Sequence, residues 1–110
     1  MKRVLALIAL VGLLASCSQY TCPTYSTPVP FIKKHHDRIT HVHIKDRKVN
    51  NGPNTPFGEG DTPIAEVLRL LRDNHWKIQA TIEFEYKVPT GSDRMTELAK
   101  TIKFCRDALA

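Results

Sequence analysis

Residues 41–47 read His-Val-His-Ile-Lys-Asp-Arg, and this stretch decides how the rest of the chain is interpreted. Successive side chains of a β-strand point to opposite faces, so the valine and the isoleucine would share one face. His41, His43 and Lys45 would then share the other face. The pattern predicts a short strand with one buried face and one polar face, whose imidazoles and ammonium group could bind a metal ion or an anion.

Residues 77–86 repeat the same alternation. One face would carry the apolar residues Ile78, Ala80, Ile82 and Phe84, and the other would carry Gln79, Thr81, Glu83 and Glu85. A helical pattern separates this segment from the first strand, so we expect the two strands to be parallel neighbours in one sheet. That arrangement would bring His43 and Glu83 to the same face.

Two amphipathic helices are expected. The first has an apolar stripe at helical spacing, formed by Ile64, Val67, Leu68 and Leu71, and we expect Thr62 to cap it. We expect Ser92 or Asp93 to cap the second, whose stripe would be Met95, Leu98, Ala99, Ile102, Cys105 and Leu109. With a long loop at 46–61, the order is strand, loop, helix, strand, loop, helix. This order predicts an α/β fold with a parallel sheet.

The N-terminus has the features of an export signal. Lys2 and Arg3 precede an apolar run at 4–14, which is too short to span a bilayer as a helix. Residues 14–17 read Leu-Ala-Ser-Cys and resemble a bacterial lipoprotein box, in which Cys17 would be lipidated. An ordinary cleaved signal or an amphipathic helix is the alternative.

From this pattern we expect a signal peptide at 1–16, a lipidated cysteine and flexible tether at 17–32, and one folded domain at 33–110. The protein would then be exported and held by a lipid anchor in the bacterial cell envelope. In an exported chain a bridge between Cys22 and Cys105 is possible, but the place of Cys105 on an apolar stripe favours a buried free thiol.

Length and charge narrow the function classes. The chain has 110 residues, enough for one domain, and a formal net charge of +5. Its lysines and arginines are scattered, without a dense basic run or interleaved aromatic residues. This pattern argues against binding to nucleic acid.

Three separated segments resemble the last two strand–helix units of the xylose-isomerase-like TIM barrels, the sugar phosphate isomerase/epimerase family. They are residues 41–47, the Pro-Phe-Gly-Glu-Gly-Asp segment at 56–61, and Ile-Glu-Phe-Glu-Tyr at 82–86. The resemblance covers about residues 33–110 and preserves the order and spacing of the motifs. It implies an incomplete barrel of two β-α units, the last quarter of a (β/α)8 fold, because a full barrel needs about 250 residues.

The resemblance also implies a site. In this family a divalent metal binds adjacent oxygens of the sugar and stabilises an enediolate, while carboxylates move the proton. It assigns metal ligands to His43 and Glu83 and places Lys45 near the substrate, with the acid–base residues left unassigned. Mixed imidazole and carboxylate ligands suit Mn, Mg, Co or Zn.

The expected function is therefore a metal-dependent isomerase or epimerase of a sugar or sugar derivative, in a truncated or internally deleted chain. Exposed edges on a two-stranded sheet favour self-association, which could supply missing parts of the site. The alternative is a small, lipid-anchored envelope protein without catalysis that carries a relic barrel fragment. A third hypothesis is metal capture by His35, His36, His41 and His43, although these histidines lack the spacing of a metal finger.

Overall fold

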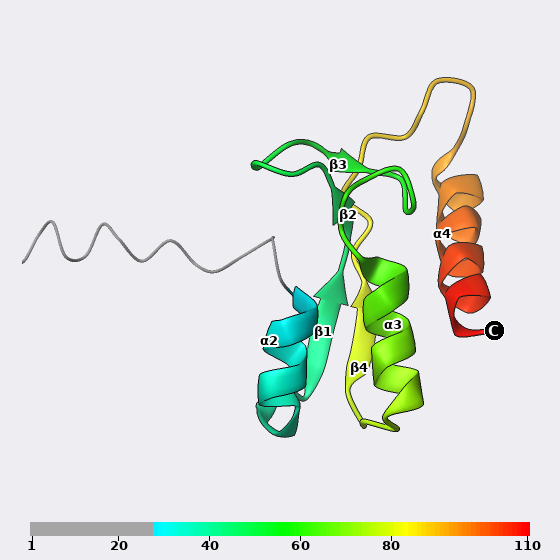
Figure 1. Cartoon of the computed structure of the whole chain (residues 1–110). Helices are drawn as coiled ribbons and strands as arrows, with labels where there is room; N and C mark the ends of the chain where they lie inside the picture. The colour runs from blue at the N-terminus through cyan, green and yellow to red at the C-terminus, as the bar shows by residue number, and fades with distance from the viewer. Residues whose placement is uncertain (1–27) are drawn as a thin grey trace, which may run out of the picture.

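The computed structural model describes residues 28–110 and shows a mixed α/β fold with a small parallel sheet (Figure 1). In chain order the elements are α2 (Pro28–His35), a 3-10 turn (His36–Arg38), β1 (His41–Ile44), β2 (Asp46–Arg47), β3 (Asn54–Thr55), α3 (Ile64–Asp73), β4 (Gln79–Ile82) and α4 (Arg94–Leu109). The expected signal peptide, Cys17 and Cys22 lie outside the described residues.

The parallel pairing of β1 with β4 is confirmed. His43 lies opposite Thr81 and Ile44 opposite Ile82, and the two strands run side by side in the same direction (Figure 1). β4 is shorter than the strand expected at 77–86, because the ladder continues past Ile82 only through the Glu83 amide. That amide donates to the Ile44 carbonyl at 2.9 Å.

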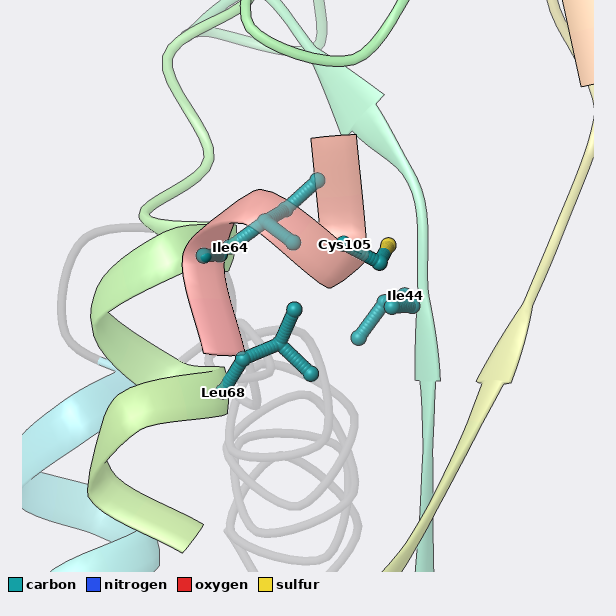
Figure 2. Packing of buried hydrophobic residues seen from close by; sticks show 5 residues of the cluster. Ile44, Ile64, Leu68 and Cys105 are labelled. Atoms are coloured by element: carbon teal, nitrogen blue, oxygen red, sulfur yellow. The ribbon is translucent and has the colours of Figure 1, made fainter. Parts of the chain in front are cut away.

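One face of the sheet is covered by the helices. Ile44 of β1, Ile64 and Leu68 of α3, and Cys105 of α4 converge in one buried cluster (Figure 2). The predicted stripe of α3 is confirmed, since all four of its residues are buried. Cys105 is a free, buried thiol, and burial raises its pKa. The apolar residues of both strands therefore face the helices, which leaves the polar row on the opposite face.

Helix α2 differs from expectation, because it begins inside the stretch expected to be a flexible tether. Val29 and Ile32 are buried against Val67 and Leu71 of α3. Two apolar residues one turn apart are too few to reveal a helical period, so the sequence pattern alone does not predict this helix. No helix within 28–110 is long and apolar enough to cross a membrane.

The long loop is held by Asp46, whose side chain is buried. Its Oδ2 accepts the Gly58 and Gly60 amides at 2.8 and 3.1 Å, and its Oδ1 accepts the Thr62 amide at 3.1 Å. A Cβ on Gly60 would lie 2.0 Å from Asp46 Oδ1, so no larger residue fits this approach. The loop also contains a small antiparallel pair, β2 with β3, that the sequence pattern did not indicate.

The prediction that Thr62 caps α3 is wrong. The residue before α3 is Pro63, and no side chain caps the helix. The Thr62 hydroxyl instead accepts the Arg47 amide at 3.3 Å. Thr62 belongs to the loop around Asp46, and this tertiary role takes its side chain away from the helix end.

The expected stripe of α4 is wrong in phase, apart from Cys105, which is buried as expected. Met95 is 72% exposed and Leu109 is 42% exposed. The buried face is formed by Glu97, Thr101, Cys105 and Ala108. The expected cap is confirmed, because Asp93 accepts the Met95 and Thr96 amides.

Polar partners explain why α4 buries a glutamate. Glu97 is 1% exposed, and its carboxylate accepts hydrogen bonds from Ser92 Oγ at 2.6 Å, Lys100 Nζ at 2.7 Å and Tyr86 OH at 3.1 Å. A buried polar group is tolerated when its hydrogen bonds are satisfied. Glu97 thereby ties the loop before α4 to the helix.

Replacing Asp46 with alanine should lower the free energy of unfolding by roughly 3 kcal/mol, because three loop amides lose a buried, charged acceptor. Urea unfolding followed by circular dichroism measures the change. Asp37→Ala is the matched control, since Asp37 is exposed, and should stay within about 0.5 kcal/mol of the parent. A similar loss in both variants would contradict the anchoring role of Asp46.

Glu97 should make the free energy of unfolding depend on pH. The hydrogen bond from Lys100, followed by that from Ser92, holds the pKa of Glu97 below its usual value. A carboxyl whose pKa is lowered in the folded state contributes stability that is present above the unfolded value, about 4.3. This contribution is lost as the pH falls through the folded pKa.

The difference in unfolding free energy between the parent and Glu97→Gln should therefore be largest near pH 7 and shrink below about pH 4. Urea unfolding at several pH values measures this difference. Glu66→Gln, at an exposed position of α3, should show little difference throughout. If the difference in unfolding free energy between the parent and Glu97→Gln stayed constant down to acid pH, the stabilising role of ionised Glu97 would be refuted.

Candidate functional site

A row of polar side chains lies on the sheet face opposite the helices. β1 and the residue after it contribute His41, His43 and Lys45, as the alternation predicts, because Val42 and Ile44 pack against the helices. Both histidines are exposed, and Lys45 is half-buried. The row is therefore accessible to solvent and follows a strand that is paired in a sheet.

Glu83 and Glu85 follow the end of β4 and meet this row. His43 Nδ1 lies 2.6 Å from Glu83 Oε1, in a contact between residues 40 positions apart. Lys45 Nζ lies 3.2 Å from Glu83 Oε2 and 2.8 Å from Glu85 Oε2. The expected meeting of His43 and Glu83 on one face is thus found, with Lys45 between the two glutamates.

These contacts set the charge states of the site. The His43 hydrogen bond, and then the Lys45 hydrogen bond, lower the pKa of Glu83, so this group is an ionised carboxylate at neutral pH. Hydrogen bonds to Glu85 and Glu83 raise the pKa of Lys45, which keeps its ammonium group charged. Because the Glu83 side chain is 26% exposed, water screens these interactions only in part.

Besides Glu85, two more residues that the resemblance did not assign belong to this cluster. His41 Nε2 lies 3.0 Å from His43 Nε2, and Asn54 Nδ2 donates to Glu85 Oε2 at 3.3 Å. The alternation of β1 already placed His41 on this face. Asn54 could not be found in this way, because it comes from β3, across the loop.

The other histidines considered for metal capture have different neighbours. His36 stacks on Trp76, with 4.1 Å between ring centroids and 4° between the ring planes. His35 lies against Phe31, with 4.7 Å between centroids. Both rings therefore contact aromatic side chains outside the polar row of β1.

The nitrogen and oxygen donors of His43 and Glu83 suit a divalent metal, but two protein ligands are few for one ion. An imidazole nitrogen and a carboxylate oxygen from adjacent strands are ligands that Mn, Co and Zn accept. Within residues 28–110, no group of three or more His, Cys, Asp or Glu side chains is placed to hold one ion. A metal here would need water or another chain for its remaining ligands.

The contact with Glu83 predicts the tautomer of His43. A carboxylate only accepts hydrogen bonds, so His43 Nδ1 should carry the proton. At about pH 8, long-range ¹H–¹⁵N NMR should show His43 mainly as the Nδ1–H form, and Glu83→Ala should remove this preference. The exposed His75 is the internal control and should not respond. A dominant Nε2–H form of His43 in the parent would contradict the contact.

Comparisons with known proteins add no relative to this picture. No model of a known protein family matches the chain, and a search of curated proteins finds no match.

Proposed function

We propose that this chain carries part of the site of a metal-dependent sugar or sugar phosphate isomerase or epimerase of the xylose-isomerase-like barrel type. Three motifs in the order of that family support the proposal, as does a parallel strand pair with helices packed on one face. In β/α barrels, functional residues lie at and after the carboxyl ends of the strands. His43, Lys45 and Glu83 lie in this region of β1 and β4.

The observation that carries the proposal is the 2.6 Å contact between His43 Nδ1 and Glu83 Oε1. Both atoms are potential ligands, and a divalent ion could replace the proton that they share. When bound, Mn, Mg, Co or Zn would supply the positive charge that polarises adjacent sugar oxygens. The residues themselves provide a fixed nitrogen–oxygen pair on a face open to solvent.

Lys45 is suited to hold the substrate. Its ammonium group lies between the Glu83 and Glu85 carboxylates, which orient it and keep it charged. A fixed ammonium donates hydrogen bonds to a hydroxyl or phosphate oxygen of a sugar. Its place beside Glu83 puts this donor next to the proposed metal ligands.

Further ligands would come from self-association or from another chain. Among residues 28–110, β1 pairs only with β4, so each strand keeps one edge without a partner strand. Unpaired strand edges add strands from other chains. A second copy is therefore the simplest partner that could extend the sheet and complete the ligand set.

Mn²⁺ should raise the melting temperature of the full-length chain, and His43→Ala and Glu83→Ala should each abolish the rise, since a ligand that binds only the folded state stabilises it. Thermal melts by circular dichroism with and without Mn²⁺ measure the effect. Glu66→Ala is the matched control and should keep the full rise. If the parent chain and Glu66→Ala show the rise, both can then be assayed for interconversion of aldose and ketose sugars.

The proposal would be contradicted if Mn²⁺ left the melting temperature of the parent unchanged, or if it raised the melting temperature equally in all variants. The alternative would then explain the chain better: an envelope protein anchored through Cys17, in which the barrel motifs persist without catalysis. The small ligand number within 28–110 is the observation that favours this alternative.

A further inference from the structure

The two histidines of β1 approach each other through their outer ring nitrogens. His41 Nε2 and His43 Nε2 are 3.0 Å apart, and their ring centroids are 5.0 Å apart with 48° between the ring planes. The residues are two positions apart on a strand, so the backbone directs both rings to the same face. Two potential metal ligands therefore converge on one point at the open face of the sheet.

The Glu83 contact determines which nitrogen of His43 is free. Because Glu83 only accepts, His43 Nδ1 donates its hydrogen, and in the neutral ring Nε2 keeps a lone pair. That lone pair faces His41 Nε2, which can donate a hydrogen to it. One proton thus lies between two imidazole nitrogens, and a metal ion placed there would have both nitrogens as ligands.

The distance fits such an ion. Zinc binds imidazole nitrogen at about 2.0–2.1 Å with tetrahedral geometry, which separates two nitrogen ligands by roughly 3.3 Å. The observed 3.0 Å needs an opening of only a few tenths of an ångström. Both side chains are exposed, so small rotations of the rings can supply it. Water would occupy the remaining ligand positions.

Glu83 has the position of a supporting carboxylate in this arrangement. One of its oxygens contacts His43 Nδ1, and the other lies 3.2 Å from Lys45 Nζ. Metal-binding histidines commonly donate their second ring N–H to a carboxylate, which orients the ring and makes the ligand nitrogen more basic. Lys45 in turn holds Glu83 in place.

We propose that His41 and His43 form a two-imidazole site for a transition-metal ion such as zinc, bound through both Nε2 atoms, with Glu83 orienting His43. The ligand nitrogen of His43 is Nε2, whereas the isomerase proposal uses Nδ1 together with Glu83 oxygen. This site needs no sugar substrate. Imidazole ligands favour Zn, Cu and Ni over Mg and Mn, so its metal preference also differs.

The test is a titration of the full-length chain with ZnCl₂, followed by long-range ¹H–¹⁵N NMR of the histidine rings. Zinc should shift the Nε2 resonances of His41 and His43 together, at one equivalent and with one affinity. His41→Ala should abolish the response of His43, because a single imidazole holds zinc weakly. His75→Ala, at an exposed histidine, is the matched control and should leave both responses unchanged.

The variant Glu83→Ala distinguishes a Glu83 that binds the metal directly from a Glu83 that only orients His43. If Glu83 orients His43, the variant should bind zinc about 10–100-fold more weakly, and both Nε2 atoms should still coordinate at high zinc. Three results would overturn the inference: no zinc response at either ring, a response at His43 Nδ1 without His41, or unchanged binding in His41→Ala. Zinc at both Nε2 atoms without any effect of Mn²⁺ on the melt would instead refute the isomerase proposal alone.

Discussion

The parallel pairing of β1 with β4 is the constraint on which the rest of the structure depends. Its register sets His43 opposite Thr81 and Ile44 opposite Ile82, so one face of both strands is apolar and the other is polar. The apolar face packs against α3 and α4 and forms the core with them. A slip of one residue in either strand would turn its apolar residues to solvent and separate His43 from Glu83.

Two buried carboxylates fix the long loop and the start of α4, which the small sheet does not contact through its ladder. Asp46 gathers three amides of the loop after β2, and Glu97 gathers Ser92, Lys100 and Tyr86 around the start of α4. A two-stranded sheet has few ladder hydrogen bonds, so satisfied polar side chains take over part of the ordering. Lys45, in the polar row, directly precedes Asp46, so the residue that anchors the loop is a chain neighbour of the row.

Much of the architecture could be predicted because strand and helix periods are local. The alternation in β1, the stripe of α3, the Asp93 cap and the burial of Cys105 all follow from residues close in sequence. The errors arose where hydrogen bonds outside the helix override its apolar pattern. Glu97 is buried through Tyr86 and Ser92, and Thr62 turns to the loop around Asp46, so the phase of α4 and the cap of α3 were both missed.

The amino-acid order alone was enough to place the polar residues of β1 on one face and to make β1 and β4 parallel neighbours, because side-chain direction and chain crossover are local or topological properties. The tertiary structure decided which atoms of these residues meet. His43 Nδ1 turns to Glu83 and His43 Nε2 to His41, since these contacts depend on rotamers and on register across forty residues. The place of helix α2 likewise depends on tertiary packing, because Val29 and Ile32 are buried in one cluster with Val67 and Leu71 of α3.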